Sequence, residues 1–361
     1  MGSSNSKVFE QEIIKLKNEN NSLQKEIKHL KSIHFEKFDD KTPHNINTTI
    51  TNIVFEGGGI KGLAYCGAMI RLNELGLINN LNKYAGSSVG AISATLLAIG
   101  YTPEELLKII KDTDFNNFMD DKFGYIRDFY NLMNDYGYCK GDYIYDWIGK
   151  LIQKKTGNPD YTFGQLYTSK NIQLVITGTN LTTLKTVYYS HCSHEHMKIR
   201  DAVRISMSIP FLFRPIEWGG ETLVDGGVID NYPLHVFDGE CPGDVSALQH
   251  LCEPNWNTIG LKLMSSEEEQ TYDLFSGKCQ ITDVKSFAYS IMNVLCKAVE
   301  QKHVTNNYWQ RTITINSGNI GTTQFNLTSK QKNFLINEGK LGVDKFIEYK
   351  ENIKMELQNK K

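Results

Sequence analysis

Two short apolar segments of the chain each run into a glycine-rich turn that opens a stretch of helical character. The first reads NIVFEGGGIKG over residues 52–62, and the second reads KYAGSSVG over residues 83–90. Strands and helices that alternate in this way favour helical layers packed on a largely parallel sheet. Because further strand and helix patterns continue along the chain, we expect an α/β protein whose sheet is mainly parallel. The last of these patterns, FNLTSKQKNFLINEG, predicts a helix that Thr328 or Ser329 caps and that ends near Gly339.

The second turn carries a serine at the centre of a G-x-S-x-G pattern. Gly86, Ser88 and Gly90 have the spacing of a sharp strand-to-helix elbow that exposes a nucleophile. The two glycines remove side chains that would clash where the chain folds back, and the dipole of the helix from Val89 favours an alkoxide at the serine. Because the pattern also occurs by chance in flexible turns, it does not by itself establish a catalytic serine.

The first turn, Gly57–Gly62, also fits the G-x-G-x-x-G pattern of dinucleotide-binding proteins. Such a site requires an acidic residue about 20 positions further on, where this chain reads NNLNKYAGSSVG. Consecutive glycines at a helix N-terminus instead expose several backbone N–H groups that bind a negative oxygen, and Lys61 adds positive charge. A tight turn that simply requires glycine is the plainer alternative.

The third glycine motif, LVDGGVIDNYP over residues 223–233, follows a short strand pattern. Asp225 comes directly before Gly226 and Gly227, and the two glycines leave room for the carboxylate to approach another part of the backbone. Asp-Gly is also common in ordinary turns, where Asn231 would only lock the loop that follows. The motif therefore leaves a catalytic and a structural interpretation open.

The three glycine motifs resemble, in their order and spacing, those of the patatin-like phospholipases. The segment RISMSIPFLFRPI, residues 204–216, is similar to the family's stretch between nucleophile and aspartate. The resemblance is close over Ile50–Pro233 and looser as far as Gly339. It implies a three-layer α/β/α hydrolase fold and a serine-dependent carboxylic ester hydrolase. Such an enzyme is a lipid acyl hydrolase, either a phospholipase A-type enzyme or a lipase, that needs no cofactor or metal ion.

The resemblance also implies a catalytic Ser–Asp dyad and a role for each motif. Ser88 is the nucleophile, Asp225 is the general base, and an acyl-enzyme forms on the serine. The backbone N–H groups of the first turn form the oxyanion hole, from Gly57, Gly58 and Gly59. The residues that support the motifs are Lys61, Gly62, Gly86, Gly90, Gly226 and Gly227. An ordinary aspartate has a pKa of about 3.9, so we expect burial to raise the pKa of the catalytic carboxyl.

Histidines leave two other sites to consider. The chain order Ser…Asp…His is that of α/β-hydrolase triads, and the histidines after Asp225 are His235, His250 and His303. The cluster HCSHEH holds the candidate metal ligands His191, Cys192, His194 and His196. Because this cluster lacks a second ligand pair at zinc spacing, we expect a surface loop there. No acidic loop suggests a calcium site.

A catalytically inactive, membrane-associated dimeric scaffold is the rival function, although the intact dyad and glycine turn argue against it.

An apolar and aromatic stripe between residues 115 and 147 lines an acyl channel, forms a lid, or belongs to an ordinary helix core. Its members are Phe115, Phe118, Met119, Phe123, Tyr125, Ile126, Phe129, Tyr130 and Trp147.

Residues 1–38 predict a coiled-coil arm outside the family pattern. Two heptad positions are largely apolar, one with Ile13, Asn20 and Ile27 and the other with Phe9, Leu16, Leu23 and Leu30. This pattern is typical of a parallel two-stranded coiled coil, so we expect a homodimer through residues 9–34; a single helix docked on its own domain is the alternative. We take residues 39–50 as a linker, 51–240 as the patatin-like catalytic core and 241–361 as the C-terminal part of the same domain.

Composition and the N-terminus bear on where the protein works. A net charge of −2 gives no general attraction for nucleic acid, and the seven cysteines show no paired spacing. With no apolar run of 18 or more residues, we expect an intracellular, cytoplasmic protein that meets a lipid or membrane as its substrate. Gly2 fits the myristoylation pattern, which would add peripheral membrane attachment.

Overall fold

The computed structural model describes residues 49–119, 135–239, 253–266, 306–322 and 324–359, together with Ile281, Phe287, Ser290, Ile291 and Val294. Residues 46–361 form one compact unit. The expected coiled-coil arm over residues 1–38, the dimer interface over residues 9–34, Gly2 and almost all of the linker lie outside the described residues. These features stay predictions.

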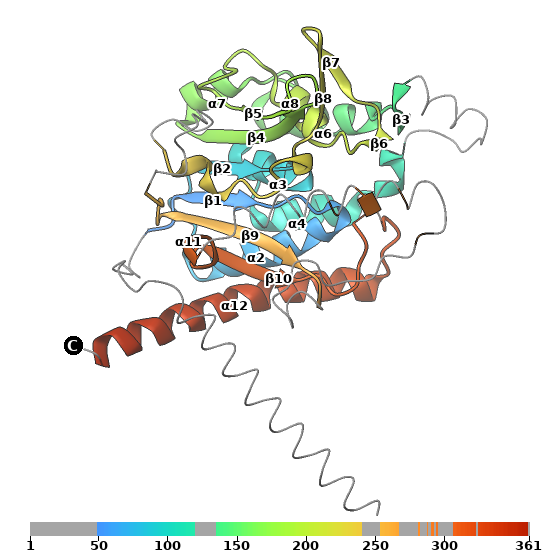
Figure 1. Cartoon of the computed structure of the whole chain (residues 1–361). Coiled ribbons are helices and arrows are strands. Elements are labelled where there is room, and N and C mark those ends of the chain that lie inside the picture. Colours follow the sequence, from blue (N-terminus) through green and yellow to red (C-terminus); the bar gives the residue numbers. More distant parts are fainter. Residues whose placement is uncertain are drawn as a thin grey trace, which may run out of the picture. The chain divides into compact units, whose positions relative to one another are not determined.

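Strands and helices alternate along the described chain (Figure 1). The strands are β1 (Asn52–Phe55), β2 (Lys83–Gly86), β3 (Gly137–Cys139), β4 (Gln173–Asn180), β5 (Lys185–Tyr189), β6 (Phe211–Phe213), β7 (Ile216–Trp218), β8 (Glu221–Asp225), β9 (Thr258–Met264) and β10 (Thr312–Asn316). The α-helices are α2 (Leu63–Glu74), α3 (Val89–Ile99), α4 (Pro103–Asp112), α6 (Asp142–Thr156), α7 (Phe163–Lys170), α8 (Ile199–Ser206), α11 (Asn306–Trp309) and α12 (Ser329–Asn359). Short 3-10 turns are η1 (Gly59–Gly62), η2 (Phe115–Phe118), η3 (Gly226–Val228) and η4 (Leu234–Phe237).

The main sheet has the strand order β10-β9-β1-β2-β4-β8-β7, with β5 paired to β4. The five strands from β10 to β4 run parallel, whereas β5, β7 and β8 pair antiparallel. The expected α/β class and mainly parallel sheet are therefore confirmed. Carboxyl ends of parallel strands meet at one edge of a sheet, and both glycine turns that follow β1 and β2 lie at that edge.

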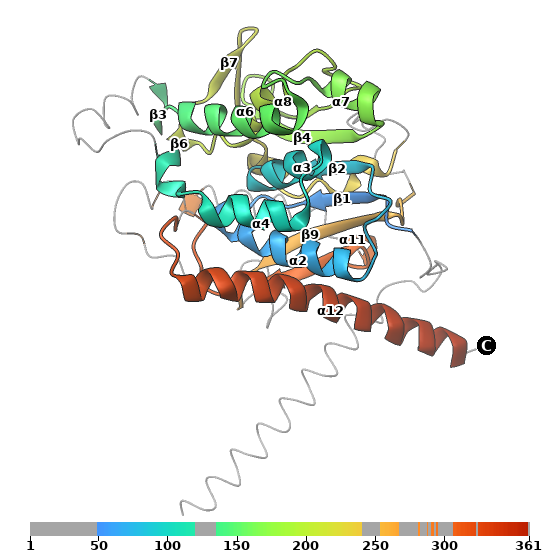
Figure 2. The same cartoon turned by 180° about the vertical axis from the view of Figure 1, so that it is seen from behind.

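Helical layers cover both faces of the sheet, which confirms the three-layer arrangement. Figure 2 shows α2, α3 and α4 in front of the sheet, and Figure 1 shows α11 on the opposite side. Strand β1 is buried throughout, as expected for a central parallel strand. Its residues alternate between the layers: Ile53 and Phe55 belong to the larger core, and Val54 packs with Phe237 of η4 on the other side.

Helix α3 is the innermost helix and carries the second glycine turn at its start. All of its residues are buried, because its sequence VGAISATLLAI is apolar on every side. The helix ends at Gly100, which adopts the left-handed conformation with φ 106°. The rigid packing of α3 fixes the position of Ser88, the residue directly before it.

Helix α12 corrects one sequence-based prediction. Its start is as expected, because the Thr328 hydroxyl accepts a hydrogen bond from the Gln331 N–H over 3.2 Å. The predicted end near Gly339 is wrong, since the helix continues to Asn359. A Cβ at Gly339 would overlap the carbonyl oxygen of Ala64 in α2. The glycine therefore lets two helices approach closely and does not terminate α12.

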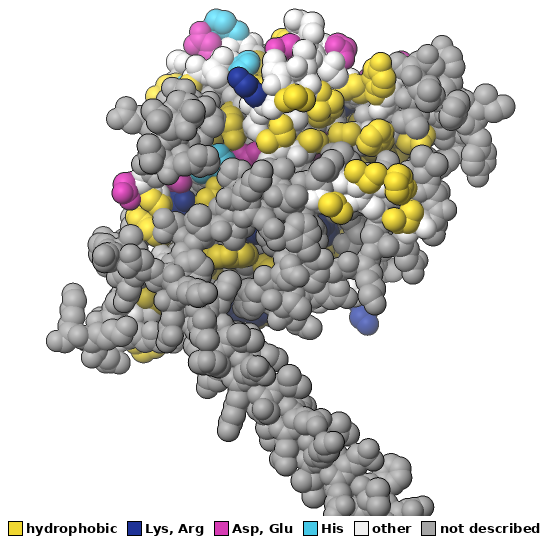
Figure 3. Space-filling model, in the orientation of Figure 1, with side chains coloured by type: hydrophobic (Ala, Val, Ile, Leu, Met, Phe, Trp, Pro, Cys, Tyr) yellow, Lys and Arg dark blue, Asp and Glu magenta, His cyan; other side chains and the backbone are white. Residues whose placement is uncertain are grey.

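No helix of the described residues combines the length and the apolar character needed to cross a membrane. Hydrophobic side chains are nevertheless exposed on the face shown in Figure 3.

Candidate active site

Ser88 occupies a sharp turn between β2 and α3, as the G-x-S-x-G spacing predicts. Its backbone has φ 52° and ψ −125°, an unusual conformation for a residue other than glycine. A Cβ at Gly86 would overlap the backbone of Gly90, and a Cβ at Gly90 would overlap the carbonyl oxygen of Phe55. Only glycine fits at either position, so the two glycines permit the elbow that holds Ser88 strained at the helix N-terminus.

The end of helix α8 holds Ser88 from the other side. The Ser88 N–H donates a hydrogen bond to the Ser206 hydroxyl over 2.9 Å. The Ser88 hydroxyl lies 3.8 Å from the sulfur of Met207. The sequence singled out this segment only through its family resemblance, because the contact joins residues far apart in the chain.

Asp225 ends strand β8 beside the elbow and is buried. Its N–H donates to the carbonyl oxygen of Ser208 over 3.0 Å, and its Oδ1 accepts a hydrogen bond from the Gly227 N–H over 2.7 Å. Its Oδ2 is buried and accepts no hydrogen bond of ordinary geometry from the described part of the chain. A Cβ at Gly226 would overlap the Thr177 hydroxyl, which explains why the chain needs a glycine after the aspartate.

Burial raises the pKa of Asp225 from an ordinary value of 3.8 to about 7. The hydrogen bond from Gly227 and the nearby Ser88 hydroxyl act in the opposite direction, because both favour the carboxylate. The structure therefore brings Ser88 and Asp225 together. A carboxyl that titrates near neutral pH is suited to exchange protons with a serine.

The first glycine turn lies against the same serine. A Cβ at Gly57 would lie 3.1 Å from the Cβ of Ser88, so the turn passes directly beside this serine. The Gly57 N–H donates to the carbonyl oxygen of Asn231 over 3.0 Å, and the Asn231 amide donates back to the Gly57 carbonyl over 3.1 Å. This pair of bonds joins the glycine turn to the loop that follows Asp225.

The Gly57 N–H already donates a hydrogen bond to Asn231, whereas the two N–H groups that follow it do not donate to any described residue. Gly59 has a left-handed φ of 57°, and Lys61 follows it in η1. Gly62 packs on the helix after the elbow, since a Cβ there would lie 2.8 Å from Val89. Of the three N–H groups expected to form an oxyanion hole, those of Gly58 and Gly59 are therefore the two without an acceptor among the described residues.

A buried ion pair anchors the start of the glycine turn. Glu56 directly follows β1, and its carboxylate pairs with the ammonium of Lys262 in β9. Both side chains are buried, and the second oxygen of Glu56 accepts the Leu263 N–H over 2.7 Å. Sequence reasoning missed this pair, because Lys262 lies far along the chain and no motif marks it.

The triad alternative receives no support from His235. Its Nε2 lies 3.2 Å from the Tyr188 hydroxyl and 3.7 Å from Asp230, and its Nδ1 lies 2.9 Å from the Tyr308 hydroxyl. No described histidine has a hydrogen bond to Asp225. The other two candidates, His250 and His303, lie outside the described residues.

The histidine cluster forms a loop after β5. His191 stacks on Tyr167 with ring centroids 3.9 Å apart, and the His196 side chain is exposed. In the part of the chain that the structure describes, no group of three or more His, Cys, Asp or Glu side chains is arranged to hold a metal ion.

The described part of the aromatic stripe packs as a small core. Phe118 contacts Phe115 at 5.1 Å and Trp147 at 5.3 Å between ring centroids. These contacts agree with the helix-core interpretation of the stripe. Residues 120–134, which include the remaining aromatic members Phe123, Tyr125, Phe129 and Tyr130, lie outside the described residues.

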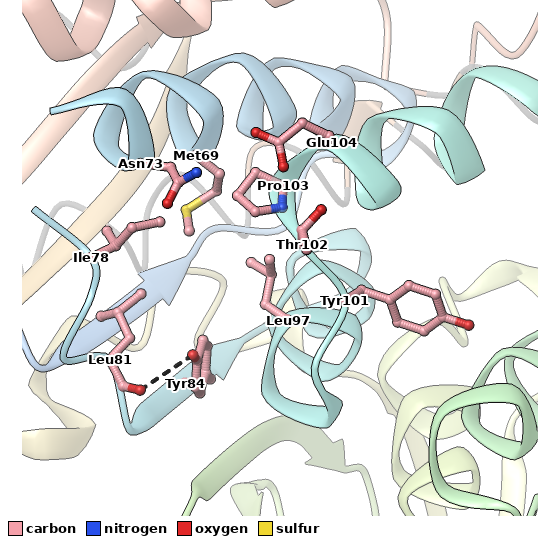
Figure 4. Close-up of a pocket in the computed structure, with 10 residues that line it drawn as sticks. All are labelled: Met69, Asn73, Ile78, Leu81, Tyr84, Leu97, Tyr101, Thr102, Pro103 and Glu104. Atoms are coloured by element: carbon pink, nitrogen blue, oxygen red, sulfur yellow. Dashed lines mark hydrogen bonds between the residues drawn. The ribbon is translucent and has the colours of Figure 1, made fainter. Parts of the chain in front are cut away.

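A cavity of about 250 Å³ lies away from these groups. Figure 4 shows Met69, Tyr84, Leu97 and Glu104 around it. Leu97 belongs to the last turns of α3, whereas Ser88 precedes the first turn. The cavity therefore lies toward the opposite end of that helix and is not the pocket of the serine and aspartate.

The fold, the elbow and the buried carboxylate beside it define a hydrolase-type α/β protein. The sequence profile of the patatin-like phospholipase family matches residues 53–238. The chain belongs to this family. The matched range contains all three glycine motifs, which confirms the resemblance noted in the sequence.

Relatives with this similarity include proteins of viruses and bacteria. Protein R571 of Acanthamoeba polyphaga mimivirus is 30% identical, over 83% of this chain and 95% of its own length. YqhO of Bacillus subtilis is 28% identical, over 81% of this chain and 97% of its own. The probable lipid hydrolase 463L of Invertebrate iridescent virus 6 is 28% identical, over 51% of this chain and 62% of its own.

The structure of VipD from Legionella pneumophila has the same fold. It superposes with a TM-score of 0.53 at 19% sequence identity and covers 83% of this chain and 67% of its own. At this identity the similarity concerns the fold alone. The family and the named hydrolase relative support lipid hydrolase activity for this chain.

Proposed function

We propose that the protein is a lipid acyl hydrolase that cleaves fatty-acyl esters of phospholipids or neutral lipids through a Ser88–Asp225 dyad. The observation that carries this proposal is the buried Asp225 carboxyl, whose pKa is raised to about 7 beside the Ser88 hydroxyl. A buried titratable group with a strongly shifted pKa next to a nucleophile is typical of a catalytic pair.

In the proposed reaction, Ser88 Oγ attacks the ester carbonyl carbon while its proton passes to Asp225. The carbonyl oxygen becomes an oxyanion that the N–H groups of Gly58 and Gly59 receive. When the intermediate collapses, the bond to the leaving alcohol breaks and Asp225 returns the proton to that alcohol. Water then attacks the acyl-serine, with Asp225 again taking and returning one proton, and the fatty acid leaves.

A serine-directed alkyl fluorophosphonate tests this assignment. The reagent forms a phosphonyl bond to an activated serine and releases fluoride, so mass spectrometry should find one adduct on the peptide that contains Ser88. Ser88→Ala should remain unlabelled, and Ser93→Ala, in the same buried helix, should label like the wild type. Labelling at another serine, or none at all, favours the inactive scaffold, which the intact elbow and carboxylate otherwise argue against.

The pH dependence of hydrolysis follows from the raised pKa of Asp225. The general base must be deprotonated, so kcat/KM for a soluble ester should rise with pH and level off above about 7. Below that value the rate should fall about tenfold per pH unit. Initial rates between pH of about 5 and about 9 measure the profile. A rate that stays constant through this range contradicts the role of Asp225.

Asn231 should position the catalytic groups without touching the substrate. Asn231→Ala removes the amide that joins the Gly57 carbonyl to the aspartate loop. A displacement of about 1 Å can lower a rate about 10²-fold, so we expect kcat to fall about 10- to 100-fold with little change in KM. Steady-state kinetics measure both constants, with Asn158→Ala as a control in a surface turn. An unchanged kcat would show that the two loops hold each other without this amide.

We also propose that residues 9–34 form a parallel homodimer and that Gly2 is myristoylated in a eukaryotic host. The apolar heptad positions support the first proposal, and the N-terminal pattern supports the second. Leu16→Asp/Leu23→Asp should convert a dimer into a monomer in light scattering, while Glu19→Gln should not. A monomeric wild type contradicts the homodimer, and an unacylated Gly2 in mass spectrometry contradicts the myristoylation.

Cytoplasmic localisation stays a proposal as well.

A further inference from the structure

Exposed apolar side chains gather beside the proposed active site. Strand β3 pairs in parallel with β6, so Gly137 lies opposite Phe211, and Tyr136 comes directly before this pair. Tyr136 is 66% exposed and Phe211 is 44% exposed. Trp218, at the end of β7, is 50% exposed, and Leu184, in the turn between β4 and β5, is 78% exposed. We call Tyr136, Leu184, Phe211 and Trp218 the apolar rim.

The rim is connected to the proposed catalytic groups through short stretches of chain. Phe211 follows closely after Met207, whose sulfur lies 3.8 Å from the Ser88 hydroxyl. Trp218 lies in a hairpin whose second strand ends in Asp225. The Leu181 N–H donates to the Thr222 carbonyl over 2.9 Å, which ties the turn that carries Leu184 to the same hairpin. The segments that carry Phe211, Trp218 and Leu184 are thus joined to the elements that hold Ser88 and Asp225.

Backbone strain is concentrated in the same place. Positive φ angles occur at five described residues other than glycine, and one of these is Ser88. Three others belong to the rim: Tyr136 with φ 57°, Leu184 with φ 58° and Phe211 with φ 67°. Such conformations are uncommon for bulky side chains. Strain that persists at several exposed apolar positions around one site indicates a functional reason for their exposure.

One ion pair lies beside the rim. Arg214, between β6 and β7, pairs with Asp135 over 2.9 Å. In Figure 3, hydrophobic side chains gather over the part of the molecule where Figure 1 places β3, β6 and β7. A surface of this kind suits an uncharged apolar partner better than an anionic one. Tyrosine and tryptophan side chains are also the residues that favour the boundary between lipid head groups and acyl chains.

We propose that the apolar rim docks on a lipid surface and so presents an ester carbonyl to Ser88. This inference rests on the proposed lipid acyl hydrolase function. It explains why the strained, exposed side chains surround the site, since a lipid substrate must leave its bilayer or droplet to reach a buried serine. The rim residues contact the lipid phase and not the reacting atoms, so they should govern hydrolysis of aggregated substrate alone.

The test compares a rim variant, Leu184→Ser/Phe211→Ser/Trp218→Ser, with the full-length wild type. Flotation with neutral phosphatidylcholine vesicles measures binding, and fatty-acid release from the same vesicles measures interfacial activity. A dissolved short-chain nitrophenyl ester measures the chemistry alone. Leu341→Ser is the matched control, because Leu341 in α12 is also 44% exposed. Thermal unfolding confirms that each variant is folded.

We expect binding and vesicle hydrolysis to fall together, by about tenfold for each rim residue removed, because each large apolar side chain adds to membrane affinity. Hydrolysis of the dissolved ester should not change, and Leu341→Ser should behave like the wild type. Brominated phosphatidylcholine should quench the fluorescence of Trp218, and Trp218→Phe should lose that quenching while it still binds.

Three results overturn the inference. The rim variant could bind vesicles as the wild type does, or the wild type could bind only when anionic lipid is added. A rim variant that changes the oligomeric state would show that the rim joins protein chains. A wild type that hydrolyses neither substrate contradicts the proposed function instead, while flotation still reports on the rim.

Discussion

Asp225→Asn should lower the rate of ester hydrolysis by at least about 10³-fold, because the serine loses the group that accepts its proton. The same change should stabilise the folded protein at pH 8. A pKa difference of one unit corresponds to about 1.4 kcal/mol. A carboxyl whose pKa moves from 3.8 to about 7 therefore destabilises the fold by about 4 kcal/mol above pH 7. The amide carries no charge and avoids this cost.

The sign of the stability effect depends on pH. The folded state holds its proton up to about pH 7, whereas the unfolded chain loses it near 3.8. The wild type should thus lose stability from this group as the pH rises through that window, and Asp225→Asn should not. Urea unfolding at pH of about 5 and about 8 measures the difference, with exposed Asp114→Asn as the control. If Asp225→Asn loses stability as well as activity at pH 8, then burial does not destabilise the ionised Asp225 carboxylate.

Lys262→Met should lower the free energy of unfolding by about 3–5 kcal/mol, because it leaves Glu56 as a buried charge without its partner. Glu56 and Lys262 are both buried, and Glu56 directly precedes the first glycine turn. Replacing both residues, as in Glu56→Gln/Lys262→Met, should restore a large part of the loss. A buried ion pair can be removed as a unit at little cost, whereas one orphaned charge is strongly unfavourable.

Urea unfolding of the two single variants and the double variant completes this thermodynamic cycle. Lys340→Met is the surface control, because its pairing with Glu74 over 3.1 Å is exposed and should contribute at most about 1 kcal/mol. If the double variant is destabilised by the sum of the two single effects, the two charges do not compensate each other. The buried pair would then not be what anchors the glycine turn.

Local motifs in the sequence predicted the parts of the site that depend on backbone geometry. The elbow at Ser88 requires glycine two residues before and two residues after the serine, so a short stretch of sequence shows the requirement. The loop at Asp225 is marked in the same way by the glycines that follow it. Such sites are visible in sequence because one short stretch of chain must fold in one particular way.

Contacts between distant segments could not be predicted in this way. The Gly57 N–H donates to the Asn231 carbonyl only when β1 and the aspartate loop pack together. Because this contact leaves no local pattern, the sequence-based prediction counted Gly57 among the oxyanion donors. The hydrogen bond from Ser88 to Ser206 and the ion pair of Glu56 with Lys262 have the same character. Each depends on tertiary packing and leaves no local pattern.

Helix α12 shows that the structural role of a glycine also depends on contacts between distant segments. At Gly100 a glycine ends α3 in the left-handed conformation, as the usual rule predicts. At Gly339 a glycine lies inside a helix, because α2 packs against it too closely for a side chain. A sequence alone does not distinguish a glycine required by backbone conformation from one required by a neighbouring helix.

Release of fatty acid from phosphatidylcholine vesicles by the wild type and by Ser88→Ala tests the proposed dyad most directly. We predict turnover by the wild type and loss to background in Ser88→Ala, with circular dichroism unchanged. Activity that survives in Ser88→Ala would contradict the assignment of the elbow serine. A folded wild type that releases no fatty acid from vesicles or from a dissolved ester would contradict the hydrolase and favour the scaffold.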